Sequence, residues 1–196
     1  MARTATTARK TNETEISVSV LIDGRGIADI STGVGFFDHL LTALSRHSMI
    51  DVRLRCVGDT QIDDHHTVED CGIALGTALN EALGDRTGIR RFGSATVPLD
   101  EALSRATVDL GGRGYFELHG EIEKVKIGTF DAELVEDFFQ ALAMNAKLAL
   151  HIERLAGRNL HHIVESMSKA TARALRDAVE IDPRCVGAPS TKGTLV

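Results

Sequence analysis

Several residue types are scarce in this chain of 196 residues, and each scarcity argues against a class of protein. Tryptophan is absent and aromatic residues make up only 4% of the chain, so aromatic platforms for stacking nucleic-acid bases are not expected. The cysteines are Cys56, Cys71 and Cys185, an odd number without a CxxC pair, which disfavours a disulfide framework. We expect them to be small buried thiols of a cytoplasmic protein.

Long hydrophobic runs and an excess of positive charge are also missing. No run approaches the roughly 18 apolar residues that span a bilayer, so we expect no membrane partner. The net charge of −6 disfavours a surface that tracks phosphates and predicts no nucleic-acid partner. The first twelve residues are polar and lack the apolar core of a secretory signal, and we expect residues 1–12 to form a flexible arm.

Hydrophobic residues make up 43% of the chain, which is enough for a folded core. Residues 15–22 alternate between apolar and polar, as a half-buried strand does, and Asp23–Gly26 is expected to turn into a second strand. Similar patterns predict further strands and, where the spacing becomes helical, helices. The expected strands are 52–56, 95–98, 104–110, 115–118 and 148–155, and the expected helices are 64–83, 131–147, 159–180 and one that begins at 36.

The two halves of the chain repeat each other. Each half has a helix, a strand, a short polar loop and a second helix, and that second helix begins with His-His-x-x-Glu. The two pairs lie 96 positions apart, from His65 to His161. We therefore predict an α+β fold of two duplicated halves, each a small sheet backed by helices, at residues 13–93 and 94–182, with an irregular tail at 183–196.

The His-His-x-x-Glu units have the composition of metal sites. Residues four apart share one face of a helix, so His65 and Glu69 can bind one ion, whereas His65 and His66 diverge by about 100°. Each unit can therefore offer ligands to two different metals. Asp64 and Asn159 are expected to be the N-caps of the two helices, which places each histidine pair in the first turn. Imidazole and carboxylate groups suit manganese, iron, cobalt or zinc. The two units are His65-His66-x-x-Glu69 and His161-His162-x-x-Glu165.

Five stretches resemble the imidazoleglycerol-phosphate dehydratase family: GFFDHLL, GDTQIDDHHTVED, GIRRFG, HIERLAGRNLHHIVES and PSTKG. The likeness covers roughly residues 13–193 and implies a duplicated fold that resembles ribosomal protein S5 domain 2. It implies manganese-dependent dehydration of D-erythro-imidazole-glycerol phosphate to imidazole-acetol phosphate in histidine biosynthesis. It also implies two Mn²⁺ ions per active site, and a homo-oligomeric shell of about 24 subunits with active sites between subunits.

The resemblance also implies roles for individual residues. The implied metal ligands are His39, His65, His66, Glu69, Asp137, His161, His162 and Glu165. Asp137 stands in EDFF, where the family has histidine, and it matches His39 of the first half. The implied substrate contacts are Glu13, His39, His47, Arg91, Arg113, Lys169, Ser190 and Lys192. Glu13 is the implied catalytic base, which removes a carbon-bound proton from the substrate.

Two other functions remain open at this stage. A non-catalytic shell protein could store metal on the His-His-x-x-Glu units, but it would not need the phosphate-binding set of Arg91, Arg113 and PSTKG. A dinuclear phosphoester hydrolase would use bridging aspartates at strand ends, and the sequence shows no such aspartates. The phosphate-binding set is therefore the feature that discriminates between storage and catalysis.

Overall fold

A computed structural model describes residues 2–195 of the chain, which form two four-stranded sheets, one two-stranded sheet and four helices. The helices are α1 (Gly35–Ser48), α2 (His65–Leu83), α3 (Leu134–Ala146) and α4 (Leu160–Val179). The strands are β1 (Thr4–Lys10), β2 (Thr14–Leu21), β3 (Ala28–Ser31), β4 (Asp51–Gly58), β5 (Phe92–Leu99), β6 (Ala102–Asp109), β7 (Tyr115–His119), β8 (Lys126–Ile127), β9 (Phe130–Asp131) and β10 (Ala149–Ala156). None of the described helices is long and apolar enough to cross a membrane.

The two large sheets have the same topology. The strand order is β1-β2-β4-β3 in the first half and β5-β6-β10-β7 in the second. In both sheets the outer pair at one edge is parallel, β3 with β4 and β7 with β10, while the other neighbours are antiparallel. The duplication predicted from the His-His-x-x-Glu units is therefore confirmed, together with the α+β fold class.

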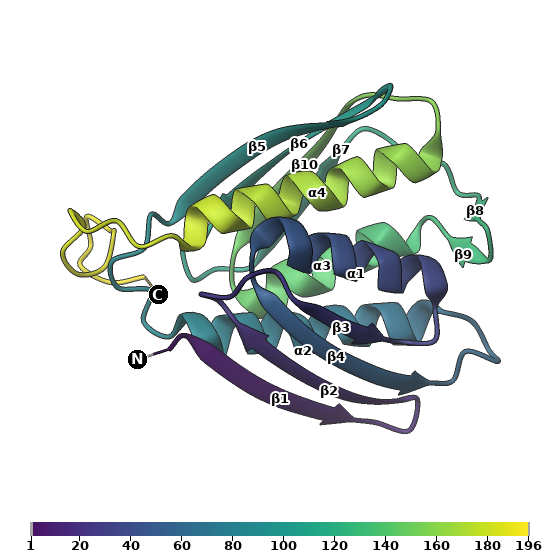
Figure 1. Cartoon of the computed structure of the whole chain (residues 1–196), viewed down its shortest axis with the longest axis horizontal. Helices are drawn as coiled ribbons and strands as arrows, with labels where there is room; N and C mark the ends of the chain where they lie inside the picture. The colour runs from purple at the N-terminus through teal and green to yellow at the C-terminus, as the bar shows by residue number, and fades with distance from the viewer. Residues whose placement is uncertain (1, 196) are drawn as a thin grey trace.

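The helices lie between the two sheets, so that the molecule has a β-α-α-β layering (Figure 1). Helix α2 packs on β1 and β2 of its own sheet, and α4 packs on β5 and β6 of the other sheet. The main helix–helix contacts cross between the halves, because α1 of the first half packs on α4 and α3 of the second half packs on α2. Residues of the two halves are thereby brought together at the helix seams.

The alternating strands bury one face each. In β2 the side chains of Ile16, Val18 and Val20 are buried while the intervening positions face outward, as the sequence predicts. Burial of such a side chain contributes about 1.5–3 kcal/mol to stability, so these positions hold the sheets against the helices. Cys56 and Cys71 are free and buried, as expected of small hydrophobes, whereas Cys185 of the tail is free but only half-buried.

The flexible arm predicted at residues 1–12 is wrong for most of its length. Residues 4–10 form β1, which pairs with β2 along its whole length at the edge of the sheet. Its side chains are threonine, alanine, arginine and lysine, so the alternation carries no large apolar residue by which it could be recognised. The first repeat consequently begins at residue 4 and not at 13, and β5 moves the start of the second repeat from 94 to 92.

Two local predictions are also corrected. The turn at Asp23–Gly26 leads into β3, but β3 lies beside β4 at the far edge of the sheet and does not pair with β2. The helix expected from residue 131 begins at Leu134, because the small hairpin of β8 and β9 precedes it. Phe130 of that hairpin is 1% exposed and stacks near Phe37, which anchors the hairpin against α1.

Candidate functional site

One group of potential metal ligands lies at the seam between α1 and α4. His39 from α1 and His161 and Glu165 from α4 place their ligand atoms within 4.8 Å of one another. The Nε2 atoms of both histidines lie 3.1 Å from Oε2 of Glu165. Two imidazoles and a carboxylate that converge in this way fit a divalent transition metal. We call His39, His161 and Glu165 cluster A.

The start of α4 holds cluster A in place. The Asn159 side chain accepts a hydrogen bond of 3.0 Å from the backbone N–H of His161, as predicted for an N-cap. Lys169 lies one turn after Glu165, with Nζ 2.8 Å from Oε1. Burial opposes ionisation of Glu165, but hydrogen bonds from Lys169 and His39 outweigh it and lower the pKa of Glu165 to about 2. The carboxylate is therefore ionised, as a metal ligand must be.

A second group of potential ligands lies at the seam between α2 and α3. Nδ1 of His65 is 3.7 Å from Oδ2 of Asp137, and Nε2 of His65 is 3.9 Å from Oε2 of Glu69. We call Asp137, His65 and Glu69 cluster B. It is more open than cluster A, since 48% of the Glu69 side chain is exposed against 12% for Glu165. Asp137 therefore stands at the repeat position of His39 but lies at Nδ1 of His65, whereas in cluster A both histidine Nε2 atoms converge on Glu165. Among the described residues, only cluster A brings three ligand atoms within 4.8 Å of one another.

The closeness of the helices at cluster B depends on two glycines. A Cβ atom on Gly72 would lie 2.8 Å from the backbone oxygen of Phe138, and one on Gly76 would lie 2.7 Å from that of Leu142. Helix α3 can therefore approach α2 only because these positions lack side chains. Phe138 directly follows Asp137, so the contact at Gly72 fixes the height of Asp137 beside His65 and Glu69.

The N-cap position of α2 is occupied by Asp64, as predicted. Asp64 precedes the helix but makes no side-chain cap hydrogen bond. Oδ1 of Asp63 instead accepts a hydrogen bond of 2.8 Å from the backbone N–H of His65. The run Asp63-Asp64 offers two carboxylates, and the backbone angles at 64 are already helical, so the earlier aspartate is the one that reaches the first turn.

The second histidine of each pair turns away from its cluster. The rings of His65 and His66 are nearly perpendicular with centroids 6.1 Å apart, and those of His161 and His162 are 6.0 Å apart. Nδ1 of His66 lies 3.1 Å from Oδ2 of Asp59, and its Nε2 lies 3.7 Å from Oε1 of Glu13. The hydrogen bond to Asp59 raises the pKa of His66. His66 and His162 thus belong to neither cluster within one chain.

His162 has a carboxylate partner of its own. Its Nδ1 lies 2.8 Å from Oε2 of Glu101, and the backbone N–H groups of Arg158 and Asn159 donate to Oε1 of the same glutamate. The bond from His162, followed by that from Asn159, lowers the pKa of Glu101 to about 2. Neither Asp59 nor Glu101 was predicted from the sequence, although Glu101 lies 88 positions after Glu13, at the matching turn of the repeat.

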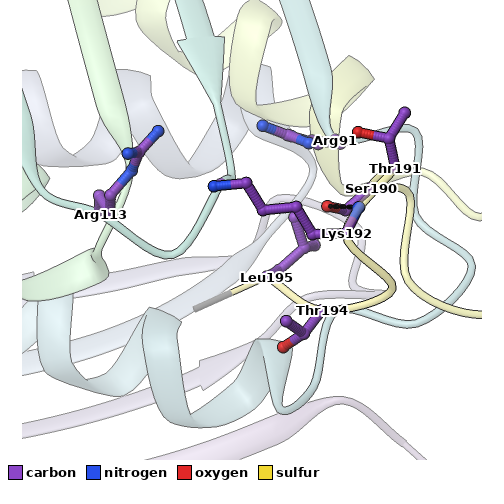
Figure 2. Close-up of a pocket in the computed structure, with 8 residues that line it drawn as sticks. Arg91, Arg113, Ser190, Thr191, Lys192, Thr194 and Leu195 are labelled. Atoms are coloured by element: carbon purple, nitrogen blue, oxygen red, sulfur yellow. Dashed lines mark hydrogen bonds between the residues drawn. The ribbon is translucent and has the colours of Figure 1, made fainter.

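A pocket of cationic and hydroxyl groups lies at the C-terminal tail. It has a volume of about 190 Å³ and brings together four of the predicted substrate contacts. Figure 2 shows the side chains of Arg113 and Lys192 extending toward the space beside Arg91. The residues that line the pocket are Arg91, Gly111, Arg113, Ser190, Thr191, Lys192, Thr194 and Leu195.

The charge of the pocket is largely uncompensated. Arg91 makes a two-pronged contact with Asp109, at 2.6 and 3.0 Å, and donates to the carbonyl oxygen of Pro189 at 2.9 Å. The bond to Asp109 raises the pKa of Arg91. Among the described residues, Arg113 and Lys192 form no ion pair with a carboxylate. Two unpaired cations beside hydroxyl groups suit an anion such as a phosphate.

Besides His39 of cluster A, two predicted substrate contacts lie along the α1–α4 seam and not in the pocket. Lys169 is held by Glu165 of cluster A. His47 is part-buried near the end of α1, and burial, followed by the charges of Lys169 and Arg173, lowers its pKa. His47 is therefore neutral near pH 7, and it faces the same cationic stretch of α4.

The pocket and cluster A lie at opposite ends of α4. His161 is in the first turn of the helix, while the backbone N–H of Arg91 bonds the carbonyl oxygen of Ala178 in its last turn. These positions are about 25 Å apart at a rise of about 1.5 Å per residue. Figure 1 likewise shows the C-terminal tail at the end of the molecule away from β8 and β9.

Comparisons with known proteins agree with the geometry. The profile of the family "Imidazoleglycerol-phosphate dehydratase" matches residues 32–175. The chain is 59% identical over 194 residues to the imidazoleglycerol-phosphate dehydratase of Dinoroseobacter shibae, covering 98% of this chain and 100% of that one. It is 56% identical to the one from Acidiphilium cryptum, over 100% of both chains.

Solved structures show the same fold. The imidazoleglycerol-phosphate dehydratase of Staphylococcus aureus superposes with a TM-score of 0.83 at 38% identity, covering 91% of this chain and 99% of that one. The Pyrococcus furiosus enzyme in complex with (S)-C348 gives a TM-score of 0.82 at 35% identity, over 96% and 100%. The chain therefore belongs to the imidazoleglycerol-phosphate dehydratase family, the dehydratases of histidine biosynthesis.

Proposed function

We propose that this enzyme catalyses the manganese-dependent dehydration of D-erythro-imidazole-glycerol phosphate to imidazole-acetol phosphate, in the cytoplasm. The observation that carries the proposal is the pairing, in one chain, of two histidine–carboxylate clusters with a separate pocket for a phosphate. A storage protein would need the clusters alone. The gathering of Arg91, Arg113, Ser190 and Lys192 in one pocket therefore favours catalysis on a phosphorylated substrate.

The clusters supply the groups that would hold manganese. His39, His161 and Glu165 would bind one ion, and Asp137, His65 and Glu69 the other, with His66 and His162 as further ligands. Nitrogen and oxygen donors without a thiolate fit Mn²⁺. A bound ion would supply Lewis-acid chemistry toward the substrate imidazole.

The remaining chemistry falls to side chains of the chain. The reaction removes a hydroxyl group from the carbon beside the imidazole and a proton from the next carbon, and the enol product becomes the ketone. Glu13 is the base in this proposal, since its carboxylate is 51% exposed and lies beside Nε2 of His66 at the cluster end of the molecule. Arg91, Arg113, Ser190 and Lys192 bind the phosphate, and Lys169 and His47 contact the substrate.

The distance between the pocket and the clusters supports assembly into a homo-oligomer. A substrate of this size cannot span about 25 Å, so the phosphate pocket of one copy must meet the clusters of another. Each cluster also has only three potential ligands from its own chain, which would leave coordination positions for ligands from a second copy. The family resemblance suggests a shell of about 24 subunits.

The test is turnover by the purified protein with manganese. We expect conversion of the substrate to a ketone, which can be measured by the absorbance of its enolate in alkali. We expect the reaction to stop when the metal is chelated. Light scattering on the same samples follows assembly, and chelation is expected to lower the particle mass because ligands from different copies share ions. Absence of ketone with manganese present would refute the proposed reaction, and an unchanged particle mass would refute metal sites between subunits.

A further inference from the structure

The repeat places a glutamate at the same turn in each half. Glu13 directly precedes β2 and Glu101 directly precedes β6, the second strand of the hairpin in each sheet. Both turns lie beside the first turn of the helix that carries the histidine pair, so each glutamate meets the second histidine of its own half. The two glutamates nevertheless meet different ring nitrogens.

In the second half the glutamate binds the near nitrogen of the ring. Oε2 of Glu101 lies 2.8 Å from Nδ1 of His162, while two backbone N–H groups hold its other oxygen. An ionised carboxylate can only accept hydrogen bonds, so the proton of the neutral imidazole must be on Nδ1. Nε2 then carries the free lone pair, which is the atom a metal needs.

In the first half an aspartate takes this place. Both oxygens of Asp59 lie within hydrogen-bond distance of Nδ1 of His66, at 3.1 and 3.2 Å. Asp59 follows β4, and its counterpart in the repeat is Gly157 after β10, which has no side chain to offer. Glu13 is thereby left on the Nε2 side of His66, at 3.7 Å, with half of its side chain exposed.

We propose that Asp59 and Glu101 are positioning residues, each of which fixes its histidine with the proton on Nδ1 so that Nε2 keeps the lone pair that a metal ion would bind. This inference rests on the proposed manganese chemistry. It also explains the difference between the two turn glutamates. Asp59 orients His66, which leaves Glu13 free to face the substrate, whereas Glu101 must orient His162 itself.

The first experiment measures the tautomers directly in the metal-free protein labelled with ¹⁵N-histidine. Proton–nitrogen correlation spectra are recorded for the parent chain and for Glu101→Ala, Glu101→Gln and Asp59→Ala, and the signals are assigned with His66→Gln and His162→Gln. We expect the proton on Nδ1 of His66 and His162 in the parent. Glu101→Ala is expected to abolish the preference for the Nδ1 proton in His162 alone, and Asp59→Ala is expected to abolish it in His66 alone. Glu101→Gln keeps a hydrogen-bond acceptor and should retain part of the preference in His162.

The second experiment measures manganese affinity by titration calorimetry on the same variants. Loss of a carboxylate that orients a ligand weakens metal binding by about 10–100-fold. Glu101→Ala and Asp59→Ala are expected to fall in this range, with Glu101→Gln closer to the parent. Glu15→Ala is the control, because Glu15 lies next to the same turn but pairs with Lys10 on the exposed face. Thermal unfolding of each metal-free variant separates loss of orientation from loss of folding.

The outcomes decide the two proposals separately. Unchanged tautomers in the folded Glu101→Ala and Asp59→Ala variants, or manganese affinities that match the Glu15→Ala control, would overturn the positioning role. A parent chain that binds no manganese would overturn the proposed function and the metal part of this inference, and the spectra would then decide the tautomer part alone. Altered tautomers together with weakened manganese binding would support both parts.

Discussion

Clusters A and B lie at matching positions of the two repeats, but they differ in composition and in exposure. Cluster A has two histidines and a glutamate that is 12% exposed and held by Lys169, whereas cluster B has one histidine and two carboxylates that are 36% and 48% exposed. Position 73, which matches Lys169 in the first half, is isoleucine. The two halves therefore place potential ligands at matching positions, but the two clusters differ in charge and exposure.

The same contrast holds for the helix seams behind the clusters. At the α2–α3 seam, Gly72 faces the backbone oxygen of Phe138. At the matching point of the α1–α4 seam, the Ser168 hydroxyl donates to the backbone oxygen of Leu40 at 3.2 Å. A close backbone approach in one half thus corresponds to a side-chain hydrogen bond in the other, and both set the height of the residue before, Asp137 or His39.

The largest expected difference between the two halves is at their turn glutamates, Glu13 and Glu101. Glu13→Gln keeps the shape of the side chain but cannot take a proton, so kcat should fall about 10²–10⁴-fold while substrate still binds. Glu101→Gln is the matched control from the other half, and it should lower manganese affinity more than it lowers kcat at saturating metal. Steady-state kinetics at saturating manganese would measure both, and a near-parent kcat for Glu13→Gln would place the base elsewhere.

A large effect is also expected in the phosphate pocket. Arg113→Ala removes a cation that has no carboxylate partner among the described residues, and this should cost about 2–4 kcal/mol of substrate binding. The loss should appear as a higher KM, with manganese content unchanged in metal analysis. Arg25→Ala, an exposed arginine of the β2–β3 loop outside the pocket, serves as the control. A KM equal to that of the parent would remove Arg113 from the site.

Much of this arrangement could be predicted from the sequence because it rests on short-range patterns. The spacing in His65-His66-x-x-Glu69 and its repeat defined the first turns of α2 and α4, and alternation defined β2 and β4. The strand β1 was missed because its threonines and alanines carry no hydrophobic signal.

The positions that depend on tertiary contacts could not be predicted in the same way. No local pattern shows that Asp59 meets His66 or that Glu101 meets His162, since each pair is joined only by the packing of a strand end on a helix. The repeat did contain one usable signal, the glutamate 88 positions after Glu13. That the phosphate pocket lies far from the clusters likewise follows only from the course of α4 through the fold.

A moderate effect on stability is expected at the close contact between α2 and α3. Gly72→Ala would place a methyl group 2.8 Å from the Phe138 backbone oxygen, so α3 must shift, and stability should fall by about 1–3 kcal/mol. The shift should also move Asp137 away from His65 and weaken metal binding at cluster B. Ser168→Ala at the matching point removes one hydrogen bond without adding bulk, and should cost about 0.5–1.5 kcal/mol. Denaturant unfolding would measure both, and an equal loss in the two variants would contradict the distinction between the seams.

The smallest expected effect concerns the ligand by which the clusters differ most directly. Asp137 holds the place that His39 has in cluster A, and its oxygen is 3.7 Å from Nδ1 of His65. A carboxylate is an acceptable ligand for manganese, but it is shorter than imidazole, so we expect cluster B to bind its ion more weakly. Asp137→His should then tighten binding at cluster B about tenfold, or ~1.4 kcal/mol, and leave cluster A unchanged. Manganese titrations of the parent, Asp137→His and the reciprocal His39→Asp would test this, because His39→Asp should weaken cluster A toward the affinity of cluster B. If Asp137→His left manganese affinity unchanged while His39→Asp lowered it, Asp137 would already be a full ligand. The two clusters would then differ in exposure and charge but not in manganese affinity.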